Sequence, residues 1–151
     1  MKFVLVLFGV LALVSATCTP ARLTQAQAEA RLKPQGISAS SSGGCTTQSI
    51  PTCTSYRNIR CTTVAGVINL KVKSRCPITI TGGTEVGHKN GTYSHYNGYK
   101  VDLKKVPCLN NFIHSKYKQI ANRSDGFPQW KTPEGNIYCD EGNHWDVTYY
   151  R

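Results

Sequence analysis

The sequence lacks three patterns, and each absence argues against a class of protein. Beyond the first 16 residues no segment approaches 18 consecutive apolar residues, so we expect no membrane-spanning helix and no membrane partner. No two of the seven cysteines form a Cys-x-x-Cys pair, which argues against a structural zinc–thiolate site. The basic residues form no continuous run and no RNA- or DNA-binding motif accompanies them, so we expect no nucleic-acid partner.

Acidic residues are also scarce. Eight aspartates and glutamates stand against 18 lysines and arginines, which gives a formal net charge of +10. One interpretation is a well-solvated surface that keeps the protein in solution. The other is attraction to a polyanion such as a bacterial wall, and the charge alone leaves both open.

The chain opens with MKFVLVLFGVLALVSA, in which one lysine precedes an apolar run and small residues. This pattern predicts a secretory signal peptide over residues 1–16, cleaved near Ala16-Thr17. Residues 17–151 would then form one secreted domain, which we expect to be a monomer. Loss of Lys2 leaves a net charge of +9, from 17 basic and 8 acidic residues.

An oxidising destination favours disulfides among the cysteines. Cys18 lies next to the expected cleavage site, so we expect it to be either unpaired or trimmed. Six cysteines remain: Cys45, Cys53, Cys61, Cys76, Cys108 and Cys139. Six cysteines allow 15 pairings, and the sequence does not choose among them. Only the local pair Cys45–Cys53 is suggested by proximity.

Helical and strand patterns alternate along the chain, which predicts an α+β fold with a small antiparallel sheet flanked by helices. Residues 37–44 suit either an edge strand or a linker, and residues 45–61 suit a disulfide-held loop. The expected elements are a helix over 25–32 capped by Thr24, a helix over 62–75, strands over 77–81 and 98–103, a helix over 109–120, and a hairpin or strand pair over 137–150.

Four residues have a spacing that suits a metal centre. Catalytic zinc sites use three His, Asp or Glu ligands, an open position for water, and a nearby general base. His95 comes seven residues before Asp102, with Gly98 between them to allow a tight turn. Far downstream, Glu141 comes three residues before His144, which can place a carboxylate beside a ligand histidine.

These residues carry a family resemblance. The stretch SHYNGYKVDL resembles the H-x-x-G-x-x-x-D element of the zinc D-Ala-D-Ala carboxypeptidase and endopeptidase family, and still more that of Hedgehog signalling domains. Glu141 and His144 resemble the second element, E-x-x-H. The resemblance covers roughly residues 76–149 and implies a Hedgehog-like fold. It implies that His95, Asp102 and His144 bind Zn²⁺, that Glu141 is the catalytic base, and that the substrate is a peptide of bacterial peptidoglycan.

The sequence departs from that family in places. Tyr93 occupies the position where these peptidases commonly have serine, and residues 81–85 (TGGTE) lack the arginine that many of them use on substrate or oxyanion. Arg57 and Arg60 are the nearest substitutes. His144 is followed by WDV rather than by a second histidine.

Further polar residues have two interpretations each. His88 either lines the cleft and donates to an oxyanion or is a surface histidine, and Glu85 contacts either a substrate amine or solvent. Asp146 either orients a ligand histidine or is a strand-end carboxylate.

Two other functions compete with a zinc peptidase. The Hedgehog resemblance also allows a non-catalytic zinc module that recognises a partner or a wall. The size, the disulfides and the histidines also suit a secreted basic ribonuclease, which would pair His95 or His144 with Glu141 without metal.

Overall fold

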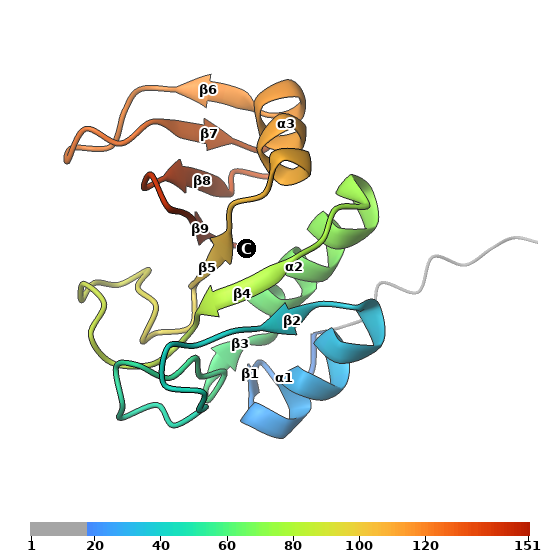
Figure 1. Ribbon diagram of the computed structural model, residues 1–151, viewed down its shortest axis with the longest axis vertical. Helices are drawn as coiled ribbons and strands as arrows, with labels where there is room; N and C mark the ends of the chain where they lie inside the picture. Colours follow the sequence, from blue (N-terminus) through green and yellow to red (C-terminus); the bar gives the residue numbers. More distant parts are fainter. Residues whose placement is uncertain (1–17) are drawn as a thin grey trace, which may run out of the picture.

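The computed structural model describes residues 18–151, so the expected signal peptide over residues 1–16 lies outside the described residues. Three α-helices, a seven-stranded sheet and a separate two-stranded sheet form the described chain (Figure 1). The elements are β1 (Arg22–Leu23), α1 (Gln25–Leu32), the short 3₁₀ helix η1 (Lys33–Gln35), β2 (Ser38–Ala39), β3 (Ile59–Arg60), α2 (Cys61–Ser74), β4 (Thr79–Gly82), β5 (Lys100–Lys104), α3 (Pro107–Lys116), β6 (Lys118–Ile120), β7 (Gln129–Lys131), β8 (Ile137–Asp140) and β9 (His144–Thr148).

The mixed α+β class is confirmed, but the predicted small antiparallel sheet is larger than expected and contains one parallel pair. The separate two-stranded sheet is the antiparallel pair of β1 and β3. In the larger sheet the strand order is β2-β4-β5-β9-β8-β7-β6, and β2 runs parallel to β4 while the other neighbours are antiparallel. Short strands at both ends enlarge the sheet. Their few residues carry almost no alternating pattern, which is why periodicity did not find β6 and β7.

The first two helices form as their sequences predict. Thr24 caps α1: its hydroxyl accepts a hydrogen bond from the Gln27 backbone N–H, and the Gln27 side chain accepts one from the Thr24 N–H. Helix α2 buries Val64, Val67 and Leu70. Val72 of the same helix is exposed.

The third helix ends earlier than expected. Its pattern continued to Ile120, but the backbone of Tyr117 is extended and residues Lys118–Ile120 pair with β7 instead. Strand pairing thus outweighs local helix propensity in this segment.

Three disulfides join the described cysteines, namely Cys18–Cys61, Cys45–Cys53 and Cys76–Cys108. The local pair Cys45–Cys53 is confirmed, but the expectation that Cys18 is either unpaired or trimmed is wrong. Cys139 is the free one, and it is buried in β8. Cys18 is paired because the segment before β1 lies beside the start of α2, where Cys61 is located. The two cysteines are 43 residues apart in sequence, so no local pattern predicts this pair.

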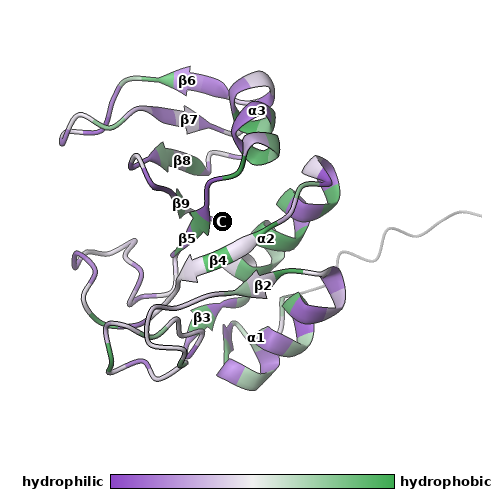
Figure 2. Cartoon of the chain, viewed as in Figure 1, coloured by the Kyte–Doolittle hydropathy of each residue, from purple (hydrophilic) through white to green (hydrophobic). Residues whose placement is uncertain are grey.

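Alternation along the central strands divides the sheet into two faces. Val101 and Leu103 of β5, with Trp145 and Val147 of β9, belong to the hydrophobic core together with residues of α2 and α3. Figure 2 shows apolar residues along β8 and β9 and on both of these helices. Asp102 and Asp146 lie between them in sequence and therefore point to the opposite face. No helix among residues 18–151 is long and apolar enough to cross a membrane.

Candidate metal centre

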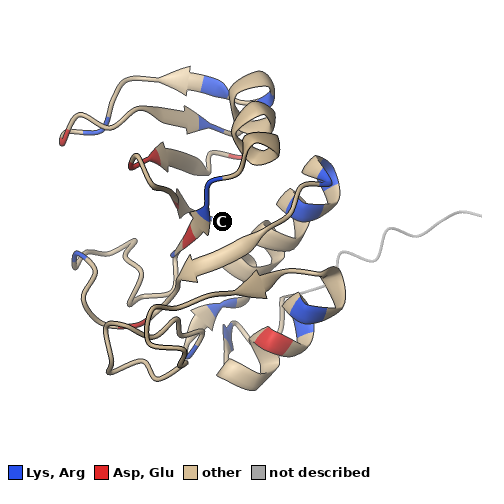
Figure 3. Cartoon of the chain, in the orientation of Figure 1, with Lys and Arg blue, Asp and Glu red and all other residues tan. Residues whose placement is uncertain are grey.

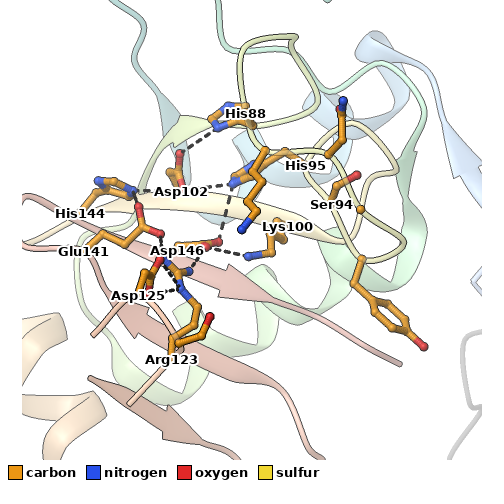
Figure 4. A pocket seen from close by; sticks show the side chains of 15 residues that line it. His88, Ser94, His95, Lys100, Asp102, Arg123, Asp125, Glu141, His144 and Asp146 are labelled. Carbon is orange, nitrogen blue, oxygen red and sulfur yellow. Dashed lines mark hydrogen bonds and ion pairs between the residues drawn. The ribbon is translucent and has the colours of Figure 1, made fainter. Parts of the chain in front are cut away.

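The two central strands bring a pair of aspartates together. Asp102 of β5 and Asp146 of β9 are directly opposed in the antiparallel register, on the face away from the core. Both are nearly buried. Three histidines surround them, and the side chains converge in one cleft (Figure 4).

His95 approaches Asp102 from a tight turn. Gly98 donates its N–H to the His95 carbonyl at 2.8 Å and has φ of +78°, a conformation that favours glycine. The His95 Nδ1–H donates to the Gly83 carbonyl oxygen at 2.9 Å, because a carbonyl can only accept. In the neutral ring this leaves the Nε2 lone pair facing Asp102 Oδ1 at 3.3 Å, the orientation found for metal-binding histidines.

His144 reaches the same carboxylate oxygen from the start of β9. Its Nε2 lies 3.5 Å from Asp102 Oδ1 and 3.0 Å from Glu141 Oε2. The turn between β8 and β9 holds the two together, since the Glu141 N–H donates to the His144 carbonyl. The structure therefore brings together all four residues of the two sequence motifs.

His88 also faces this centre, although no spacing pattern in the sequence marks it as a ligand. Its Nδ1 lies 3.9 Å from Asp102 Oδ2, and its ring stacks on that of His95 with centroids 3.8 Å apart. His88, His95 and Asp102 each offer one ligand atom, and these three atoms lie within 4.8 Å of one another. The three residues could therefore hold a metal ion.

Glu85 positions His88 and contacts neither bulk solvent nor the cleft. Glu85 is 2% exposed, and its carboxylate accepts hydrogen bonds from the backbone N–H groups of Ser55 and Gly83 and lies 2.8 Å from His88 Nε2. Burial disfavours the ionised form, but the hydrogen bonds, led by that of His88, outweigh it and lower the pKa of Glu85. The ionised Glu85 directs the His88 Nε2–H to itself and leaves Nδ1 facing Asp102.

Two buried carboxylate oxygens at the centre have no hydrogen-bond partner among the described residues: Asp102 Oδ1 and Asp146 Oδ1. An unpaired buried carboxylate oxygen is costly, so a cation is needed beside it. The pKa values point the same way. Burial alone would lower the pKa of His95, yet Asp102 and Asp146 raise it to about 9, which means that the site favours positive charge at this position.

The acidic residues gather here, although the protein is basic (Figure 3). Four of the eight acidic residues of the protein line the cleft, namely Asp102, Asp125, Glu141 and Asp146. A fifth, Glu85, contacts His88, which also lines the cleft. Three cations line the same cleft, Lys89, Lys100 and Arg123. Five carboxylates against three cations leave a charge of −2 with neutral imidazoles, which one divalent cation would neutralise.

Asp146 is held from the side opposite to His95. Lys100 Nζ donates to its Oδ2 at 2.7 Å and Arg123 Nη1 donates to the same oxygen at 2.8 Å. Although burial opposes ionisation, His95 and Lys100 hold the pKa of Asp146 well below its ordinary value. Asp146 is thus an ionised residue beside a candidate ligand rather than a plain strand-end carboxylate.

The arginines considered from sequence do not enter the cleft. Arg60 stacks on the Tyr99 ring at 4.0 Å, and Arg57 is exposed on a separate hollow. Arg123 lines the cleft instead. It follows β6, outside either motif, and only the position of that short strand beside β7 brings it to the site. His114 lies against Trp130 and Trp145, away from the centre.

No family model, curated protein or solved structure matches the chain. The site therefore has to be interpreted from its own geometry.

Proposed function

We propose that the protein is a secreted zinc metallopeptidase in which His95, Asp102 and His144 bind Zn²⁺. The observation that carries the proposal is the convergence of two imidazole nitrogens on one buried carboxylate oxygen. His95 Nε2 and His144 Nε2 lie 3.3 and 3.5 Å from Asp102 Oδ1, which has no hydrogen-bond donor among the described residues.

The donor set fits zinc chemically. Two imidazoles and one carboxylate are typical of catalytic zinc sites, which leave a fourth position open. Nitrogen donors also favour zinc over magnesium or calcium, which prefer oxygen ligands. Zinc bound at this centre would polarise a scissile carbonyl and lower the pKa of a water molecule to about 7.

Glu141 is the residue we assign as general base, because its Oε2 lies 3.0 Å from His144 Nε2, within reach of the same centre. It would accept a proton from the attacking water as the water oxygen bonds to the carbonyl carbon. When the carbon–nitrogen bond breaks, Glu141 would pass that proton to the leaving amine. The products are a carboxylate and a free amine, so the reaction is a peptide hydrolysis.

The substrate class rests on the motif resemblance described above. The order and spacing of His95, Asp102, Glu141 and His144 match those of the D-Ala-D-Ala peptidases, whose substrates are peptides of bacterial peptidoglycan. A basic protein would also be attracted to an anionic wall. The disulfides agree with an oxidising, extracellular destination.

The experiment is a metal analysis together with a wall-digestion assay on the wild type and Glu141→Gln. We expect about one zinc per chain in both, and a kcat lower by about 10²–10⁴-fold in the variant. Glu134→Gln is the matched control, because Glu134 is an exposed glutamate in the turn before β8. A wild type without zinc would refute the metal assignment, and full activity of Glu141→Gln would refute the assignment of the base. Activity on RNA that survives a chelator would select a ribonuclease instead.

One observation favours a second candidate, a non-catalytic zinc module. His88 Nδ1 faces Asp102 Oδ2 at 3.9 Å, so His88 could supply a fourth protein ligand. Four protein ligands are typical of structural zinc sites, which have no place for water. Zinc binding with no turnover of wall peptides, together with a gain of turnover in His88→Ala, would identify this closed form.

A further inference from the structure

Arg123 projects into the cleft from the loop between β6 and β7. The loop is a tight turn, in which the Arg123 N–H donates to the Phe127 carbonyl at 2.9 Å and the Gly126 N–H donates to the Arg123 carbonyl at 2.8 Å. The guanidinium extends from this turn toward Glu141 and Asp146 (Figure 4). It is the only guanidinium among the described residues that line the cleft.

The guanidinium divides its hydrogen bonds among three carboxylates. Nε and Nη2 donate to Asp125, and Nη1 donates to Asp146 Oδ2 at 2.8 Å. Nη2 also donates to Glu141 Oε1, so one nitrogen serves both Asp125 and Glu141. Arg123 therefore holds Glu141 at Oε1, while Glu141 Oε2 lies 3.0 Å from Nε2 of His144, the proposed zinc ligand.

Arg123 holds Glu141 Oε1 through a nitrogen that it shares with Asp125, and this shared nitrogen is where a substrate group can bind. A second carboxylate entering the cleft can take the place of Glu141 on Nη2, because guanidinium groups bind carboxylates in a planar fork. Glu141 Oε1 would then be free to accept a proton from water. The cleft has a volume of about 470 Å³, which is in the range of small-ligand sites. Two other cations line it: Lys100, which donates to Asp146, and the exposed Lys89.

We propose that Arg123 binds the C-terminal carboxylate of the substrate and thereby makes the protein a carboxypeptidase, which removes the last residue of a short peptide. The inference rests on the proposed function and adds the position of the scissile bond. Arg123 is a specificity-determining residue in this account. An endopeptidase would have no substrate carboxylate to place there, and Glu141 would stay bound to Arg123.

The experiment compares an acyl-D-Ala-D-Ala peptide with its C-terminal amide, using zinc-loaded wild type, Arg123→Gln and Arg123→Lys. Hydrogen bonds to charged groups contribute enough for about a 10- to 100-fold preference in kcat/KM for the free acid in the wild type. We expect Arg123→Gln to lose this preference and Arg123→Lys, which keeps the charge, to retain part of it. Arg57→Gln, a change at an exposed arginine outside the cleft, is the control and should keep the full preference.

The outcomes separate the inference from the proposed function. Equal cleavage of acid and amide by the wild type, or an Arg123→Gln variant that slows both while keeping the preference, would overturn the role of Arg123 and leave the peptidase standing. A zinc-loaded wild type that cleaves neither peptide and no other wall peptide would overturn both. Denaturant unfolding of each variant shows whether the Arg123 loop still folds, and Arg123→Lys keeps the comparison valid if Arg123→Gln is unstable.

Discussion

Replacing Gly98 by alanine should disturb both the fold and the metal centre. Gly98 has φ of +78° and closes the turn that carries His95. A Cβ atom at this position would lie 2.8 Å from the Asn58 carbonyl oxygen and 2.9 Å from the Arg60 backbone nitrogen. Both neighbours are backbone atoms of the β1–β3 pair and its loop, so they cannot swing aside as a side chain would.

The magnitude follows from two contributions. Left-handed backbone costs an alanine about 1–2 kcal/mol. Overlap with packed atoms adds about 1–3 kcal/mol. Gly98→Ala should therefore lower the free energy of unfolding by about 2–5 kcal/mol. Gly44→Ala isolates the first contribution, because Gly44 has φ of +63° and a Cβ atom added there would have no neighbour within 4 Å, and it should cost only about 1–2 kcal/mol.

Urea unfolding of both variants, with a chelator present, measures this difference without the contribution of bound metal. Zinc titration then tests the coupling to the site, where Gly98→Ala should bind more weakly than the wild type and Gly44→Ala should not. Equal unfolding free energies for the two variants would refute the steric argument. Unchanged zinc affinity in Gly98→Ala would show that the turn does not position His95.

Three further outcomes are expected. Glu85→Gln should weaken zinc binding by about 10- to 100-fold in a titration if His88 contacts the metal, and an unchanged affinity would remove His88 from the metal shell. The folded-state pKa of Glu85 is lowered, so the stabilisation by its carboxylate is present above its unfolded pKa, about 4.3, and is lost as pH falls through the folded value. The metal-free wild type should therefore lose more stability than Glu85→Gln between about pH 5 and 3. Parallel losses in the two proteins would contradict this assignment. The double variant Cys76→Ser, Cys108→Ser should lower the free energy of unfolding by about 1 kcal/mol more than removal of the Cys45–Cys53 disulfide, because Cys76–Cys108 closes a longer loop (32 against 8 residues). Denaturant unfolding measures both values. The reverse order would contradict a loop-entropy origin.

Several parts of the protein follow from local patterns in the sequence. The Thr24 capping box and the apolar face of α2 are short-range patterns, and the structure has both helices. The spacing of His95 to Asp102 and of Glu141 to His144 is also local, since each pair spans a single turn. These motifs were therefore visible before any fold was known.

Which of these parts lie next to one another depends on long-range pairing in the folded chain. Asp102 and His144 come together because β5 and β9 pair, a contact across more than 40 residues that no periodicity encodes. The pairing of Cys18 with Cys61 is of the same kind. The position of Arg123 in the cleft is also a long-range effect. It depends on the pairing of β6 with β7, and β6 occupies residues that the sequence assigned to the end of a helix. The orientation of His88 is the feature least predictable from the sequence, because it is set by Glu85, a glutamate that is buried only in the folded protein.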